Sequence, residues 1–180
     1  MQNHCFLIFI IVSLFCIGCS NAQNKAWNPD DNLLIASYRI VEGLEKNLTK
    51  SPLTPNDLII VASFVDVSDL GKSTPFGRII AEQIGSRLSQ KGFQVIELKL
   101  RQKSIFIDSE GKGEFLLSRN LKDISLDHNV SAVVVGTYTP AYDKIYVSTR
   151  IIDPKSNIIR SAYDYKIPVN YKDLRALLKN

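Results

Sequence analysis

The chain has 180 residues, a formal net charge of +4 and 45% hydrophobic residues, enough for one domain with a buried core. This composition excludes disordered and collagen-like proteins, and the charge is far weaker than that of a typical nucleic-acid-binding face. The three cysteines are Cys5, Cys16 and Cys19. The chain after Cys19 therefore holds no disulfide, cysteine-ligated zinc site or thiol nucleophile.

The N-terminal segment has the pattern of an export signal. Phe6–Phe15 is apolar apart from Ser13 and is shorter than the roughly 20 residues that span a bilayer as a helix. A short apolar run followed by small residues is typical of a secretory signal peptide. Because Cys16–Cys19 resembles a bacterial lipobox, we predict a lipoprotein signal peptide over residues 1–18 and lipidation of Cys19.

Lipidation of Cys19 predicts an anchor in the outer membrane, on its periplasmic face, since Ser20 favours sorting there. Several acyl chains on one cysteine hold a protein firmly, whereas a single chain does not. The alternative is an ordinary signal peptide cleaved near Ala22. Two features differ from the usual lipobox signal: leucine is usual where Cys16 stands, and residues 1–4 contain no Lys or Arg.

After a polar tether over residues 19–28, we predict an α/β domain over residues 29–169. Pro29–Asn32 provides residues that begin helices. The helix that follows carries apolar residues at helical spacing, which predicts its buried stripe. These residues are Leu34, Tyr38, Val41, Leu44 and Leu48.

The next elements form a strand, a loop, a helix and a second strand. Leu58–Phe64 is apolar almost throughout, as in a strand buried on both faces. Thr74 can cap the following helix, and Pro75 suits its first position. The buried stripe of that helix is Phe76, Ile80, Ile84 and Leu88, and Gly92 closes it. Phe93–Leu98 is the second strand, which predicts a parallel pair joined by one helix.

The C-terminal half predicts a short helix, three strands and a terminal helix. The short helix is Asn120–His128, and Asn129 suits the left-handed conformation at its end. The strands are Ala132–Val135, Lys144–Ile152 and Ile158–Ile167, with a turn at Asp153–Asn157 between the last two. Asn170–Lys179 is a helix with Leu174, Leu177 and Leu178 exposed on one side, within an amphipathic tail over residues 170–180. The fold class is a single-domain α/β sandwich with a mixed sheet of about five strands covered by helices.

Gly71-Lys72-Ser73 matches the end of a phosphate-binding loop, and it lies between a buried strand and a helix, as such a loop requires. Asp66, however, occupies the position of the first glycine. Asp66 and Asp69 also place carboxylates where the loop would surround an anionic phosphate. We therefore interpret the stretch as a connector and expect no nucleotide ligand. A hydrolase that uses the Asp66–Ser73 loop is a remote alternative.

Other groups suited to acid–base catalysis do not form a recognisable pattern. Nothing in the spacing of the carboxylates selects a catalytic pair, and Arg78 with Glu82 is explained as a helix pair. His128 is expected to contact a helix end rather than to act as a ligand or base. We predict no catalytic, metal-binding or cofactor-binding residue and no enzyme activity. The carboxylates weighed are Asp66, Asp69, Glu82, Glu97 and Glu110.

Positive charge is concentrated between Lys72 and Lys103, where seven basic and two acidic residues give +7 − 2 = +5. This segment is either a solvated surface or a region attracted to an anionic envelope surface or an acidic partner. Five tyrosines gather in the region of the last three strands and their connections, the predicted β-meander, where cross-strand packing explains them. They are Tyr138, Tyr142, Tyr146, Tyr163 and Tyr165.

Several short motifs, in order along the chain, resemble the FlgO family of flagellar outer-membrane proteins. The likeness covers about Asp57–Val169. The sequence differs from the family at Asn129, where glycine is usual, and in its longer N-terminal helix. The motifs are Ser63–Asp66, Phe76–Arg78, Ala81–Gln83, Ser86–Leu88, Gly113–Arg119, Ala132–Tyr138 and Ala162–Tyr165.

The resemblance implies an exported protein or lipoprotein of the outer membrane that supports flagellar assembly and motility without enzyme activity. It also implies a fold similar to the N-terminal domain of TolB. Its partners would be other flagellar or envelope proteins, bound through the Asp66–Thr74 loop, the basic Lys99–Lys103 segment or the terminal helix. The alternative hypothesis is a cell-envelope scaffold outside the flagellum. It would be TolB-like or associated with polysaccharide or peptidoglycan.

Overall fold

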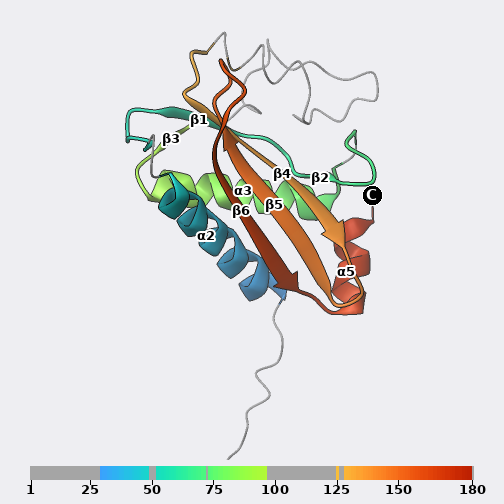
Figure 1. Cartoon of the computed structure of the whole chain (residues 1–180). Coiled ribbons are helices and arrows are strands. Elements are labelled where there is room, and N and C mark those ends of the chain that lie inside the picture. Colours follow the sequence, from blue (N-terminus) through green and yellow to red (C-terminus); the bar gives the residue numbers. More distant parts are fainter. Residues whose placement is uncertain (1–28, 49–51, 72, 97–124, 126–127, 180) are drawn as a thin grey trace, which may run out of the picture.

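A computed structural model describes residues 29–48, 52–71, 73–96, 125 and 128–179. Within these ranges one mixed sheet of six strands has the order β3-β1-β4-β5-β6, and β2 pairs with β4. Two helices, α2 and α3, lie against one face of the sheet (Figure 1). The elements are α2 Pro29–Asn47, β1 Leu58–Val61, β2 Val65–Asp66, α3 Pro75–Gln90, β3 Gln94–Val95, β4 Ala132–Pro140, β5 Lys144–Ile152, β6 Ile159–Pro168 and α5 Tyr171–Leu178.

The pairing of the strands confirms the predicted α/β class. β1 runs parallel to β3 and to β4, whereas β4, β5 and β6 form an antiparallel meander. The main core lies between the sheet and the helices α2 and α3, and a smaller cluster around Ile60 and Val133 lies on the opposite face. The central strands β1 and β4 are therefore buried on both faces, as their continuous apolar sequences predict.

The predicted strand Leu58–Phe64 is interrupted. β1 ends at Val61, and β2 begins at Val65, although both pair with β4. Ala62 still donates its N–H to the carbonyl of Val134 at 2.9 Å, but the N–H of Phe64 turns to Gly77 in α3 at 3.1 Å. The hydrogen bond from Phe64 to the helix thus interrupts a stretch that the sequence, apolar apart from Ser63, predicts as one strand.

The predicted stripe on the first helix is wrong at its start. Leu34 is 41% exposed, whereas Leu33 is 4% exposed and Ile40 is fully buried. Val41, Leu44 and Leu48 are buried as expected. Two stripes one residue apart fit the same spacing, and the packing of α2 against both β6 and α3 selects the one that starts at Leu33.

The second helix agrees with its prediction in both packing and length. All four stripe residues of α3 are buried, Pro75 occupies its first turn, and Gly92 follows it with φ of +91°. Thr74 occupies the capping position, but its side chain makes no capping hydrogen bond. The predicted position of the cap is therefore confirmed, but the Thr74 side chain does not form the capping hydrogen bond.

The C-terminal elements differ from the predictions mainly in length. β4 extends five residues beyond Val135, to Pro140. The Asp153 carboxylate accepts hydrogen bonds from the N–H groups of Lys155 and Ser156, which lowers the pKa of Asp153 and closes the predicted turn. Leu177 and Leu178 of α5 pack against the core, so the prediction that they are exposed is wrong.

Some predictions fall on residues that the structure does not describe. These include the signal peptide and tether, the Leu98 end of the strand after Gly92, the Lys99–Lys103 segment and most of the helix predicted at Asn120–His128. Asn129 is described and has φ of 49°, which confirms its predicted left-handed conformation.

Candidate functional site

The loop between β2 and α3 is held by its own carboxylates. Asp66 Oδ1 accepts hydrogen bonds from the N–H and the hydroxyl of Ser68, at 2.8 and 2.6 Å. Asp69 Oδ1 accepts one from the N–H of Gly71 at 3.1 Å. The backbone of Asp69 also donates to the carbonyl of Asp66, at 3.1 Å. The part of the loop from Asp66 to Gly71 is thus closed by its own hydrogen bonds.

These bonds explain why the loop is poorly suited to phosphate. A phosphate cradle needs backbone N–H groups directed at an anion, but here the N–H groups of Ser68 and Gly71 already bind carboxylates. A phosphate would also face the negative charge of Asp66 and Asp69. Lys72 lies outside the described residues. The interpretation of this stretch as a connector agrees with its geometry.

The base of the loop is a buried polar contact between Thr74, the residue before α3, and β4. The hydroxyl groups of Thr74 and Tyr138 are 2.8 Å apart, and both residues are buried. The rings of Tyr138 and Phe76 form a T-shaped pair, with centroids 4.9 Å apart and planes at 71°. Burial raises the pKa of Tyr138, because a phenolate would lose its hydration. The Thr74 hydroxyl thus forms a hydrogen bond with the buried Tyr138 hydroxyl instead of capping α3.

Three of the motifs that carry the family resemblance meet at Phe64. Its carbonyl accepts the Ser73 hydroxyl at 2.8 Å, and its N–H donates to Gly77. The Phe64 ring fills the space above Gly136 where a side chain would otherwise lie. Gly77 likewise lies directly against the Phe64 carbonyl. Sequence reasoning missed these contacts, although a glycine inside an apolar strand is a known sign of close approach.

Two apolar side chains at the outer end of the loop are exposed to solvent. Val67 is 55% exposed and Leu70 is 56% exposed. The N–H of Val67 donates to the carbonyl of Tyr138, which continues the parallel register of β2 beside Thr139. Thr139 in turn pairs with Tyr146, which is 51% exposed. We call Val67, Leu70 and Tyr146 the loop surface.

The remaining candidate residues do not join this loop in a catalytic group. His128 precedes β4, whereas Asp66 pairs with Tyr138 near the opposite end of that strand. Glu97 and Glu110 lie outside the described residues. Within the described part of the chain, no group of three or more His, Cys, Asp or Glu residues could hold a metal ion.

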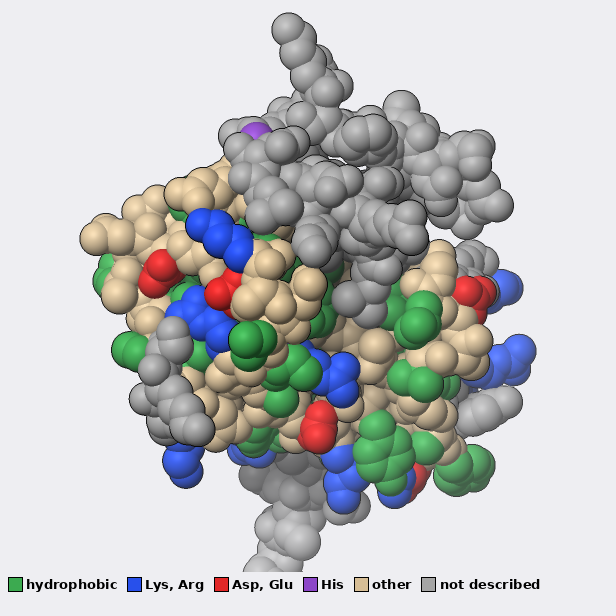
Figure 2. Space-filling model, turned by 45° about the horizontal axis from the view of Figure 1, so that its top comes forward, with side chains coloured by type: hydrophobic (Ala, Val, Ile, Leu, Met, Phe, Trp, Pro, Cys, Tyr) green, Lys and Arg blue, Asp and Glu red, His purple; other side chains and the backbone are tan. Residues whose placement is uncertain are grey.

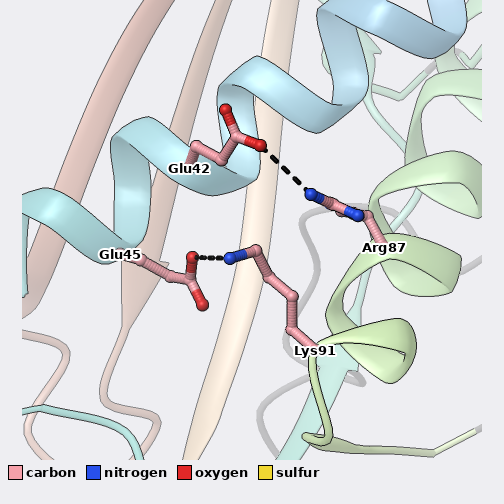
Figure 3. A network of polar contacts seen from close by, with 4 residues as sticks. All are labelled: Glu42, Glu45, Arg87 and Lys91. Atoms are coloured by element: carbon pink, nitrogen blue, oxygen red, sulfur yellow. Dashed lines mark hydrogen bonds and ion pairs between the residues drawn. The ribbon is translucent and has the colours of Figure 1, made fainter.

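Much of the predicted basic surface on α3 is neutralised by α2. Arg87 forms an ion pair with Glu42 at 3.1 Å, and Lys91 forms one with Glu45 at 2.6 Å (Figure 3). The Arg87 guanidinium also lies 4.4 Å from the centre of the Tyr38 ring. These basic groups join two helices rather than forming a free positive face.

The face drawn in Figure 2 carries mixed charge, with acidic and basic side chains interspersed among hydrophobic ones. Lys99, Arg101 and Lys103 lie outside the described residues, so their part of the basic segment stays a prediction. None of the helices in the described ranges is long and apolar enough to cross a membrane.

Comparison with solved structures shows a shared fold at very low sequence identity. The LpoB C-terminal domain from Escherichia coli is 10% identical, with a TM-score of 0.56 over 75% of this chain and 97% of that chain. The same domain from Salmonella enterica is 10% identical, with a TM-score of 0.54 over 76% and 98%. The NMR structure of E. coli LpoB is 12% identical, with a TM-score of 0.54 over 77% and 68%. At this identity the likeness concerns the fold alone, and it leaves the similarity to TolB as a prediction.

No curated protein matches the sequence. A family model does: the one described as FlgO protein matches residues 38–172. This match begins in the middle of α2, includes every motif that carries the resemblance, and covers well over half of the chain. The chain therefore belongs to the FlgO protein family.

Proposed function

We propose that this protein is a lipid-anchored cell-envelope component, at the periplasmic face of the outer membrane, that supports the flagellum by binding other proteins. Membership of the FlgO family supports the flagellar role, and the Cys16–Cys19 sequence supports the anchor. The observation that carries the binding function is the loop surface, where Val67 and Leu70 are more than half exposed on a closed turn. An exposed apolar projection of this kind suits a protein contact, because binding would remove its apolar surface from water.

We propose no catalysis. The carboxylates of Asp66 and Asp69, which a hydrolase would use, accept hydrogen bonds from the loop's own backbone. A general base must instead reach the proton that it removes from substrate or water. The hydrolase therefore remains the remote alternative to a binding role.

The second candidate is an envelope scaffold outside the flagellum. The fold shared with the LpoB domains supports it as well as it supports the flagellar role, since a fold by itself does not specify function. The two candidates differ in one simple phenotype. A flagellar component is needed for swimming, whereas a general envelope scaffold is needed for envelope integrity in cells that swim normally.

A strain that lacks the gene is expected to lose most of its swimming on soft agar, and the wild-type gene is expected to restore it. The variant Val67→Asp/Leu70→Asp should restore at most about a tenth of the swimming radius, because charge at an interface core removes its apolar contact. Exposed Ile158 and Ile159 provide a matched control at the opposite end of the sheet. Their double change to aspartate should restore swimming fully.

Two results would count against this proposal in different ways. Normal swimming and intact flagella in the deletion strain would exclude the flagellar role and favour the envelope scaffold. Full complementation by Val67→Asp/Leu70→Asp, at wild-type protein level, would exclude the loop surface as the binding site while leaving the flagellar role in place.

The anchor predicts a specific chemical label. Cells fed an alkyne fatty acid should incorporate it into the wild-type protein, whereas Cys19→Ala should reduce the label to background, because Cys19 is the proposed acceptor. Equal labelling of both proteins would exclude lipidation at Cys19 and favour cleavage near Ala22.

A further inference from the structure

β6 forms one edge of the sheet, and its backbone direction can be read from two hydrogen bonds. Val169, just beyond β6, donates its N–H to Asp143 at 2.9 Å, so the odd-numbered residues face β5. The carbonyl of Ala162 instead accepts a hydrogen bond from the Asn47 side chain in α2, at 2.9 Å. Even-numbered residues of β6 therefore direct their N–H and C=O groups away from the sheet.

The outward-directed residues beyond Ala162 are Asp164 and Lys166, and both are exposed. Neither forms an ion pair with another residue in the described part of the chain. The pairing of β5 with β6 is regular along this stretch, because its register shift lies at Ile151 and Ile152. An edge strand with unpaired backbone groups is a template for another strand.

The two charges select one way of pairing this strand with itself. We propose that β6 pairs antiparallel with β6 of a second copy of this chain, around a two-fold axis at Tyr165. Asp164 then lies opposite the second copy's Lys166, and Lys166 lies opposite the second copy's Asp164. Both pairs join outward-directed residues, so each exchanges backbone hydrogen bonds, and both place opposite charges side by side on one face.

Neighbouring registers are unfavourable by the same rule. An axis at Asp164 places this carboxylate opposite its own copy, and an axis at Lys166 does the same for the ammonium group. An axis at Tyr163 places Lys166 opposite the second copy's Arg160. Like charges directly opposite each other destabilise a strand pair. An axis at Ile167 would place Lys166 opposite the second copy's Pro168, which has no N–H to donate. The axis at Tyr165 is therefore the one that the sequence favours.

The symmetry also fixes the arrangement of the helices. Because paired residues project from the same face, the helix layers of both copies lie on one side of the joined sheet. Pro29, where α2 begins, is then on that same side in each copy. This arrangement is compatible with two anchors in one membrane, but the pairing does not depend on the anchor.

Charge reversal tests the proposal in the detergent-extracted full chain, with mass in solution measured by sedimentation velocity. The wild type is expected to be a dimer. Asp164→Lys and Lys166→Asp should each weaken dimerisation about ten-fold or more, because two attractive pairs become repulsive. Mixing the two variants should restore a dimer, since every pair in the mixed dimer is again attractive. Asp164→Lys/Lys166→Asp within one chain should also restore it.

Lys172→Asp on α5, where Lys172 is exposed, is the matched control and should leave the dimer intact. Thermal unfolding of each variant separates loss of pairing from loss of folding. A monomeric wild type, or a dimer that is unaffected by either single reversal, would overturn the proposal. So would two monomeric variants that stay monomeric when mixed although both are folded.

Discussion

Gly77→Ala is expected to lower the free energy of unfolding by about 3 kcal/mol or more, or to prevent folding. A Cβ atom at this position would collide with the backbone carbonyl of Phe64 and would lie 2.7 Å from the Ser73 hydroxyl. Backbone cannot move aside as the end of a flexible side chain can. The same movement would break the hydrogen bond from the Phe64 N–H to Gly77.

Gly85 provides the control on the same helix. A Cβ there would lie 3.8 Å from both Val61 and Val95, which is ordinary contact. Gly85→Ala should therefore raise stability by about 0.5–1 kcal/mol, because alanine favours the helix over glycine. Urea unfolding followed by circular dichroism measures both changes. Equal stability of Gly77→Ala and wild type would mean that α3 does not approach Phe64 closely.

The elements that could be predicted from the sequence depend on local patterns. α3 has an uninterrupted apolar stripe, a first-turn proline and a terminal glycine, and all of these signals act within one element. The turn at Asp153–Asn157 is likewise closed by its own Asp153 carboxylate. The α/β class followed from the order of such elements, because alternating strands and helices favour a partly parallel sheet.

What could not be predicted depends on partners distant in sequence. The stripe of α2 starts at Leu33 rather than Leu34 because β6 and α3 fix its rotation. Thr74 forgoes capping because Tyr138, 64 residues away, needs a partner for its hydroxyl. Spacing within one segment contains no information about either partner.

The candidate site likewise has features that could be predicted from the sequence and features that could not. The replacement of a glycine by Asp66 argued against a phosphate loop from the sequence, and the structure shows that this carboxylate binds the loop itself. The exposure of Val67 and Leu70 had no sequence signal, because an apolar residue in a loop can be buried or exposed. The role of Phe64 was also hidden, since its three contacts come from the loop, α3 and β4.

The contact between Phe64 and Gly136 predicts non-additive stability. Gly136→Ala would place a Cβ atom inside the space of the Phe64 ring, which is fully buried and whose backbone is held on both sides. We expect a loss of about 2–4 kcal/mol. Phe64→Ala alone removes the ring and leaves a cavity, which costs about 3–5 kcal/mol.

The double variant Phe64→Ala/Gly136→Ala should lose at least about 1 kcal/mol less than the sum of the single changes, because the new methyl group no longer meets a ring and fills part of the cavity. Gly43→Ala is the matched comparison, since its Cβ atom would meet the ring of Tyr163 instead. Its effect should add to that of Phe64→Ala within about 0.5 kcal/mol. If the Gly136 and Phe64 changes were additive as well, the Phe64 ring would not be what requires glycine at position 136. The convergence of three family motifs on this residue would then need another physical cause.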